Sequence, residues 1–278
     1  MNTLTTNDLH LTLEQADVAY WQDYFLAARG FPETAPYVDF RLFGEGVVAG
    51  LFRNHDILAF NRCLGLGLSA DPNPAQVAEV SAFYEQAGIP RFFVPVFPGS
   101  DTPGIPSSLE RAGILPYNRW AKLFRHADQP LPDGRSSALR LRPASVSDRA
   151  VYAHIISTAF DWPAPLGYFF AAILGRRGWY PYLAMDGAKT VAVGALYVTG
   201  EIGVLAIAAT LPDYRNRGAQ NALIQHRIRL ARVLGCRYLS VETAEDKPDT
   251  PCQSYQNLRK HGFELAYLRP NYLKRFAD

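Results

Sequence analysis

The feature that constrains the fold most is a repeat of landmarks about 150 residues apart. Three pairs of residues correspond in their order and surroundings: Gly88 with Gly235, Gly113 with Gly262, and Tyr117 with Tyr267. The separations within these pairs, 147, 149 and 150 residues, are nearly constant. A constant offset of this kind favours duplication of one α/β unit over a chance likeness between two helix-turn-strand segments.

A polar segment between the repeats, residues 126–138, is rich in Pro, Gly and Ser and is typical of an interdomain linker. We therefore expect two tandem domains with mixed sheets of the α/β (α+β) class, residues 1–128 and residues 137–278.

The apolar patterns of the second domain predict these elements: a strand over 139–143, a helix from Ser145 past Phe160, strands over 180–185, 190–198 and 202–209, a helix over 219–234, a strand over 238–242, a short helix over 254–261 and a strand over 264–268. In the first, residues 74–86 predict a helix.

Composition limits the classes of function. The chain has 278 residues, 48% of them hydrophobic, which is enough for a sizeable core. Its formal net charge of +2 is too small to indicate a nucleic-acid or membrane partner, and its longest apolar runs are too short to span a bilayer. Because there are three cysteines without metal-ligand spacing and no basic, apolar leader, we expect a cytoplasmic protein without a metal. We also expect either a monomer or a homodimer.

The stretch 202–224 is the most informative for function. An apolar run that predicts a buried strand precedes an Arg/Gly-rich turn, and a helix opens near Ala219. The first amides of a helix have no acceptor inside it, and the helix dipole adds partial positive charge at the same end. Arg215 and Arg217 flank the turn, and Gly218 lets a ligand approach the backbone. This pattern predicts a cradle for a phosphate or pyrophosphate.

The first half differs at the corresponding turn. Residues 65–74 keep glycines but contain no arginine, and Asp71 lies among them. An anion would lose its charge-assisted partners there. We therefore expect that the first domain does not bind the ligand of the second.

Four arginines form a basic set on and after the helix that follows the Arg/Gly turn: Arg227, Arg229, Arg232 and Arg237. No aromatic residues are interleaved with them, and the net charge of the chain is small. We interpret the set as a solvated face and not as a nucleic-acid patch.

The second half resembles the GNAT-type N-acetyltransferases, and the first half resembles a degenerate copy of the same fold. The resemblance is carried by the turn Pro212-x-Tyr214, the motif Arg215-x-x-Gly218, the strand ending at Glu242 and the segment from Leu258 to Phe263. Gln220 stands where the family has a small residue. The resemblance implies that acetyl-CoA is the cosubstrate and that its acetyl group moves to a primary amine of a small molecule or peptide.

The resemblance also implies a cofactor site. The CoA pyrophosphate would bind the backbone of the turn, with Arg215 or Arg217 adding charge. Ala208, Ala209 and Thr210 would face the pantetheine, and an N–H near Thr210 would polarise the thioester carbonyl. The residues assigned to the turn are Asn216, Arg217, Gly218, Ala219, Gln220 and Asn221, and those assigned to the pantetheine or its sulfur are Ser254 and Asn257.

Three residues are candidates for proton transfer. Glu242 lies where the family often has a general base, which would contribute ~10²–10⁴ in rate; alternatively it is paired with one of the many arginines. The family's tyrosine acid is replaced by Leu258. Tyr255, about one helical turn away, and Tyr267 are therefore the candidate acids, and partial burial without a catalytic role is the alternative for both.

The aromatic residues before the motif predict part of the acceptor pocket. Trp162 and Tyr168 are candidates to line it, although core packing accounts for most aromatic residues in this region. Two other functions remain open. Gln220 and Leu258 suggest an acyl-CoA-binding sensor or pseudoenzyme without turnover. A nucleotide-binding module is disfavoured because no Walker Lys-Ser/Thr pair follows the turn.

Overall fold

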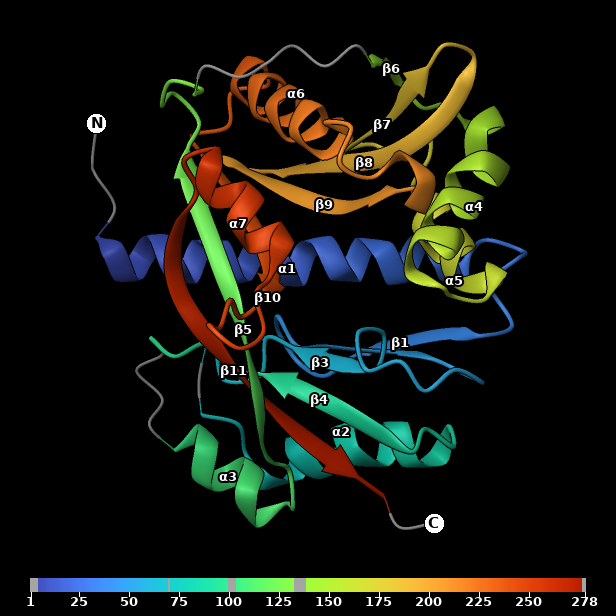
Figure 1. Cartoon of the computed structure of the whole chain (residues 1–278). Helices are drawn as coiled ribbons and strands as arrows, with labels where there is room; N and C mark the ends of the chain where they lie inside the picture. The colour runs from blue at the N-terminus through green and yellow to red at the C-terminus, as the bar shows by residue number, and fades with distance from the viewer. Residues whose placement is uncertain (1–4, 70, 100–103, 133–138, 277–278) are drawn as a thin grey trace.

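The computed structural model describes residues 5–69, 71–99, 104–132 and 139–276 (Figure 1). The first half contains α1 (Thr6–Arg29), β1 (Val38–Leu42), β2 (Val48–Phe52), β3 (Arg62–Leu64), α2 (Pro74–Gln86), β4 (Arg91–Pro95), α3 (Ile105–Arg111) and β5 (Leu115–His126). The second half contains β6 (Arg140–Pro143), the 3-10 turn η1 (Val146–Asp148), α4 (Arg149–Phe160), α5 (Ala164–Ala171), β7 (Trp179–Asp186), β8 (Lys189–Thr199), β9 (Ile202–Thr210), the 3-10 turn η2 (Pro212–Tyr214), α6 (Ala219–Val233), β10 (Tyr238–Ala244), α7 (Gln253–Lys260) and β11 (Glu264–Arg275). From β1 and from β7 onward, the two halves follow the same order of strands and α-helices, as the repeat predicts.

One mixed sheet contains all eleven strands of the described residues, in the order β1-β2-β3-β4-β11-β5-β10-β9-β8-β7-β6. The two halves exchange their last strands within it. β5 pairs antiparallel with β10 of the second half, β11 pairs antiparallel with β4 of the first half, and β5 and β11 pair with each other. In Figure 1 these two long strands run between the upper and lower groups of elements. The division into residues 1–128 and 137–278 stays a prediction, and the hydrogen bonds of the sheet join the two segments.

The strand exchange explains why β11 is longer than the sequence predicted. The pattern indicated a strand over 264–268, whereas β11 continues to Arg275. Residues 271–275 pair with residues 91–95 of β4. The extra length therefore depends on a partner strand from the other half, which local alternation does not reveal.

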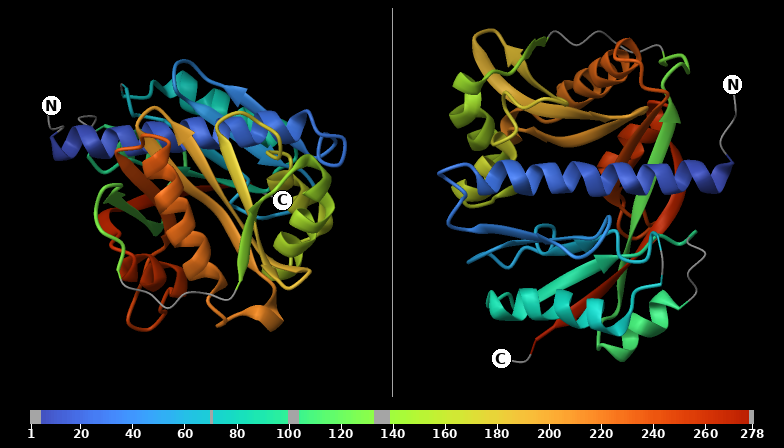
Figure 2. Two further views of the ribbon diagram at one scale, coloured as in Figure 1. Left: turned by 90° about the horizontal axis from the view of Figure 1, so that it is seen from above. Right: turned by 180° about the vertical axis from the view of Figure 1, so that it is seen from behind.

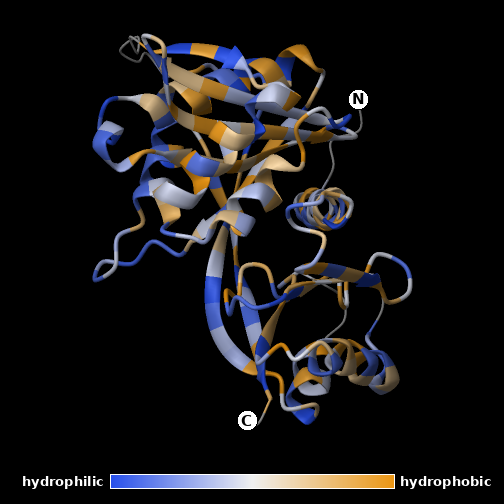
Figure 3. Cartoon of the chain, turned by 90° about the vertical axis from the view of Figure 1, so that its right-hand side faces the viewer, coloured by the Kyte–Doolittle hydropathy of each residue, from blue (hydrophilic) through white to orange (hydrophobic). Residues whose placement is uncertain are grey.

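Helix α1 lies between the two groups of elements, seen from behind in Figure 2 and end-on in Figure 3. Its Tyr24 and Phe25 are fully buried in one cluster with Phe60 of the first half and Phe169 of the second. The ring centre of Phe169 lies 5.5 Å from the ring centre of Tyr24 and 5.0 Å from that of Phe60. Each aromatic pair of this kind contributes about 0.5–1.5 kcal/mol beyond the burial of its surface. The contacts of α1 with both halves therefore stabilise their association.

Helix α1 begins at a capped turn. The hydroxyl of Thr5 accepts a hydrogen bond from the N–H of Asp8 at 3.2 Å, which satisfies one of the unpaired amides at the helix start. Glu14 and Asp17 are both buried on this helix, so it also carries carboxylates into the interior. None of the described helices is long and apolar enough to cross a bilayer.

The side chains of β8 alternate between two layers of the second half. Val193 and Ala195 belong to the aromatic cluster of α1, α4 and α5, whereas Leu196 packs in a second cluster with Ile224 and Ile228 of α6. This alternation is the period-two pattern of a strand buried on both faces. It places α6 and its N-terminus on one face of the sheet, beside the end of β9.

Candidate functional site

Strands β9 and β10 are paired at one end only. Their parallel register covers Ile202–Val204 against Tyr238–Ser240. Beyond it, residues 205–210 and residues 241–244 line a shared cavity and do not pair with each other. The sheet is therefore open between the two strands, and their unpaired backbone groups are available to a ligand.

A β-bulge interrupts the regular pairing of β9 with β8 beside this opening. Between the pairs Leu196↔Leu205 and Gly194↔Ala208, β9 advances by three residues where β8 advances by two. A bulge of this kind bends a strand and turns local carbonyl and amide groups out of the regular ladder. The register change thus coincides with the start of the opening.

Arg227 of α6 fixes this bulge from inside the protein. Its Nη1 donates hydrogen bonds to the carbonyl oxygens of Ala195 and Ala206, both at 3.2 Å. The side chain is buried, and burial lowers the pKa of its guanidinium to about 10, so it remains charged at neutral pH. We expected Arg227 on a solvated basic face; instead its cation holds the carbonyls beside the opening.

The turn before α6 leaves several backbone amides free. Asn216 and Gly218 have positive φ angles of 61° and 83°, which turn the chain sharply into the helix. Among the described hydrogen bonds, none is donated by the backbone N–H groups of residues 219–221. These amides face the site with the partial positive charge of the helix start.

The two arginines of this turn are placed differently. Arg215 lines the cavity, and its Nη2 donates a hydrogen bond to the carbonyl oxygen of Ala159 at 2.8 Å. Arg217 lies outside the cavity lining, with its guanidinium 4.9 Å from the ring centre of Tyr214. Arg215 is therefore the better placed to add charge at the mouth of the site.

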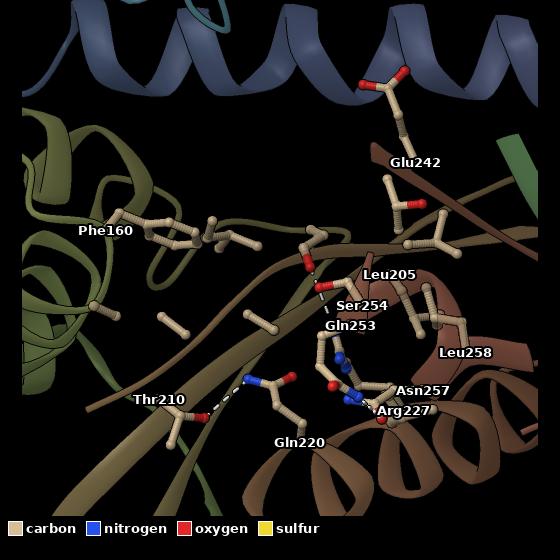
Figure 4. A pocket seen from close by; sticks show the side chains of 18 of the residues that line it. Phe160, Leu205, Thr210, Gln220, Arg227, Glu242, Gln253, Ser254, Asn257 and Leu258 are labelled. Atoms are coloured by element: carbon tan, nitrogen blue, oxygen red, sulfur yellow. Dashed lines mark hydrogen bonds between the residues drawn. The ribbon is translucent and has the colours of Figure 1, made fainter. Parts of the chain in front are cut away.

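Gln220 bridges the mouth of the opening. Its Nε2 donates a hydrogen bond of 3.0 Å to the hydroxyl of Thr210, joining the start of α6 to the end of β9 (Figure 4). A small residue at position 220 would leave this space empty. The larger side chain thus reduces the room beside the free amides.

The cavity has a volume of about 840 Å³ and collects most of the residues predicted for the site. Those that line it are Trp162, Ala208, Ala209, Thr210, Arg215, Asn216, Gly218, Ala219, Gln220, Asn221, Glu242, Ser254 and Asn257. Four predicted residues do not line it: Tyr168, Arg217, Tyr255 and Tyr267. Their ligand contacts and chemical roles stay predictions.

The two candidate tyrosine acids lie away from the cavity wall. Tyr255 is partly buried against the cluster that contains Leu258, because it is on another side of α7 from Ser254 and Asn257. Tyr267 donates its hydroxyl to the Glu14 carboxylate at 2.5 Å. Burial, together with Glu14, raises the pKa of Tyr267 well above its ordinary value. Neither tyrosine lines the cavity, and the role of each as an acid stays a prediction.

Tyr168 also lies elsewhere than expected. It lines a separate surface pocket with Phe31 and Arg149, and its ring centre is 6.2 Å from that of Phe31. Tyr168 and Trp162 are on the same stretch of chain, but the helix α5 turns them to different surroundings. Trp162 lines the cavity and Tyr168 does not, and the place of both in an acceptor pocket stays a prediction.

Glu242 is at the cavity wall, where it points toward α1 in Figure 4. Its Oε1 is 3.2 Å from Nη2 of Arg62, and its second oxygen is paired with Arg269. Both oxygens of this carboxylate are therefore already held by guanidinium partners. Of our two interpretations, the arginine-paired carboxylate is the one that this geometry favours.

Glu242 belongs to a buried network of balanced charge. Arg269 also pairs with Glu14 and Asp17, each at 2.9 Å, and Lys122 pairs with Asp17 at 2.5 Å. Burial by itself raises the pKa of Asp17, but Lys122 and Arg269 outweigh it, so that the pKa is lowered. The network contains three carboxylates and three cations: Glu14, Asp17, Glu242, Arg62, Lys122 and Arg269.

Sequence reasoning missed the part of the cavity wall that the first half supplies. This wall consists of Asp17, Tyr20 and Trp21 of α1, Ala59 before β3, and Trp120 of β5. The only sequence signal was the density of aromatic residues near Trp21. Nothing local connects these residues to a turn in the other half of the chain.

The corresponding turn of the first half is filled by the protein itself. The side chain of Asn73 accepts a hydrogen bond from the N–H of Gln76 at 2.7 Å, and Pro74 begins α2. A Cβ atom on Gly67 would come within 2.1 Å of Ile105. This helix start is therefore capped and its loop closely packed. Our expectation that the turn binds no ligand, which rests on its missing arginines, stays a prediction. Among the described residues, no group of three or more His, Cys, Asp or Glu is arranged to hold a metal ion.

Comparisons with known proteins agree with the expected family. Residues 149–263 match the model of the acetyltransferase (GNAT) family. This segment, which contains the opening, the turn and α6, is thus a GNAT-family domain. No curated protein matches the chain in sequence.

Solved structures show the fold of the whole chain. A tandem GNAT protein from the clavulanic acid biosynthesis pathway is 14% identical, with a TM-score of 0.60 over 99% of this chain and 98% of that one. A GCN5-related N-acetyltransferase from Kribbella flavida is 15% identical, with a TM-score of 0.59 over 91% and 96% of the two chains. A third, from Sphaerobacter thermophilus, is 17% identical, with a TM-score of 0.56 over 86% and 76%. The fold is therefore that of a tandem GNAT protein, which confirms the predicted fold class.

Proposed function

We propose that the chain is an N-acetyltransferase that takes the acetyl group of acetyl-CoA and transfers it to the primary amine of a small molecule or peptide. One observation supports this proposal most directly. Within the GNAT-family domain, the opening between β9 and β10 leads to free backbone amides at the start of α6. An elongated ligand with an anionic end fits this combination.

In the proposal, the second half alone holds the cosubstrate. The amides of residues 219–221 would bind its diphosphate, with Arg215 adding charge. The pantetheine would lie along residues 208–210, beside Ser254 and Asn257 of α7. The bulge that Arg227 holds would present backbone groups to the thioester end.

The transfer itself needs an unprotonated amine. Its nitrogen attacks the thioester carbonyl carbon, the carbon–sulfur bond breaks, CoA leaves as a thiolate, and the former amine gives up one proton to solvent water. Because an ordinary thiol has a pKa near ~8.5, the thiolate can leave without a dedicated acid. We assign no base role to Glu242, since Arg62 and Arg269 already hold its carboxylate. Apolar surroundings instead favour the uncharged amine by desolvation.

A second candidate function rests on Gln220. Its hydrogen bond to Thr210 reduces the room at the free amides, and Tyr255 and Tyr267 lie away from the cavity. An acyl-CoA-binding sensor without turnover would tolerate both features. It would bind acetyl-CoA and release no thiol with any amine.

Calorimetric titration with acetyl-CoA, ATP and NAD tests the proposed site, and thiol release over a panel of amines tests turnover. Asn221→Asp adds a negative charge in the first turn of α6, which suits the helix but repels a diphosphate. Gln225→Glu adds the same charge one turn later, outside the cavity. We expect Asn221→Asp to weaken acetyl-CoA binding at least ~10-fold, because two like charges in contact, about 4 Å apart near a protein surface, repel by over ~1.4 kcal/mol. Gln225→Glu should leave the affinity unchanged. Equal affinity in both variants would contradict the proposed cradle.

A further inference from the structure

We propose that the first half builds the acceptor compartment and that this compartment selects a primary amine carried on a compact aromatic body. The inference rests on the proposed acetyl transfer and goes beyond it by naming the class of acceptor. It follows from the part of the cavity wall that lies toward α1, opposite the cradle of α6. In this region the two halves of the chain meet.

Aromatic side chains from both halves line this part of the cavity. The first half supplies Tyr20, Trp21 and Trp120, and the second supplies Trp162 and its neighbours. The ring of Trp162 is stacked on Phe160 with centres 4.6 Å apart. Flat surfaces of this kind gain most from an aromatic ligand, which can stack on them or meet them edge-on.

Arg62 holds the wall of the first half in place. Its guanidinium carbon lies 4.5 Å from the ring centre of Trp21 and 5.0 Å from that of Trp120. The same guanidinium is fully buried and pairs with Glu242. One positioning residue therefore fixes two tryptophans of the compartment and connects them to β10.

The charges beside this wall are already compensated. Asp17 and Glu242 reach the cavity, but Lys122, Arg62 and Arg269 pair with them from the buried side. With three carboxylates against three cations, the network offers no surplus negative charge to a polyamine or a basic peptide. Recognition therefore falls to the aromatic surfaces. The position of the wall between α1 and β10, where both halves of the chain line the cavity, favours a compact acceptor.

Three amines serve as probes of this class: 2-phenylethylamine, butylamine and spermidine. We expect kcat/KM for 2-phenylethylamine to exceed the value for butylamine at least ~10-fold, because an aromatic ring gains packing that a short alkyl chain cannot. Spermidine should be no better than butylamine. An equal or higher value for spermidine or butylamine would overturn the proposed class.

Two variants locate the compartment. Ala59→Phe fills the cavity from the turn before β3, and we expect it to lower kcat/KM for 2-phenylethylamine at least ~10-fold with unchanged acetyl-CoA affinity. Ala78→Phe is the matched control, on an exposed position of α2. Trp120→Leu should reduce the preference for 2-phenylethylamine over butylamine to less than threefold.

Each result separates this inference from the proposed function. Thiol release with none of the amines, despite acetyl-CoA binding, would contradict the transferase and with it the acceptor. Turnover that Ala59→Phe leaves intact, in a protein that melts as the wild type does, would overturn the compartment alone. A change in acetyl-CoA affinity equal to the change in kcat/KM would also overturn it, because the wall would then belong to the cosubstrate site.

Discussion

The ion pairs of Glu242 make a strong prediction about the variant Glu242→Gln. Removing this carboxylate leaves Arg62 and Arg269 in the interior with one negative charge fewer. Breaking a buried pair destabilises by about 3–5 kcal/mol. Because 15% of the Glu242 side chain is exposed, we expect a loss of about 2–4 kcal/mol in the free energy of unfolding. Urea unfolding at pH 7 measures it.

Glu245→Gln is the matched control, three residues further along. The Glu245 side chain is 11% exposed, much as that of Glu242, but its partners Arg119 and Lys247 are 54% and 52% exposed. Because these cations keep their contact with water, the loss should be only about 0–1 kcal/mol. In the same preparations we expect the pH profile of kcat/KM to keep its acidic limb in Glu242→Gln, because the acceptor amine itself titrates. The reasoning would be refuted by equal stability of the two variants, or by an acidic limb that disappears with Glu242.

Three other predictions concern the cradle and the entry to α4. Gln220→Ala removes the hydrogen bond to Thr210, which contributes about 0.5–1.5 kcal/mol, and should tighten acetyl-CoA binding ~2- to 10-fold by calorimetry; weaker binding would mean that Gln220 is itself a ligand donor. Titration should give one acetyl-CoA per chain because Asn73 caps the corresponding helix of the first half, and a stoichiometry of two would contradict this. The hydrogen bonds from Arg142 hold the pKa of Asp148 well below its usual range, so its contribution to stability is present above pH ~4 and is lost as the pH falls through the lowered folded value. Asp148→Asn should therefore cost about 1–2 kcal/mol at pH 7 and less at pH 3 in chemical unfolding, and a constant difference would contradict that assignment.

Much of the second half could be predicted from local patterns. The strands that become β7 to β9 and the helix α6 were placed within one or two residues, because both faces of these strands are buried and the helix has a marked turn before it. The turn before α6 and its free amides were predictable for the same reason, since their parts are consecutive in the chain. The repeat also predicted the order of elements in the first half.

Contacts between distant segments could not be predicted. The sequence did not predict the burial of Arg227, because charged residues on a helix are usually solvated. The carbonyl groups that accept its hydrogen bonds lie on β8 and at the bulge of β9. The pairing of Glu242 with Arg62 joins β10 to β3, which are separated by β4, β11 and β5 in the sheet. Exchange of β5 and β11 creates this neighbourhood, and a single sequence shows no sign of it.

A crystal structure of the protein with acetyl-CoA is the most direct test of the central claim. The account predicts that the diphosphate accepts hydrogen bonds from the amides of residues 219–221 and that the thioester lies between β9 and β10. A cosubstrate bound elsewhere, or a cavity in which Gln220 still contacts Thr210 and no ligand enters, would contradict it.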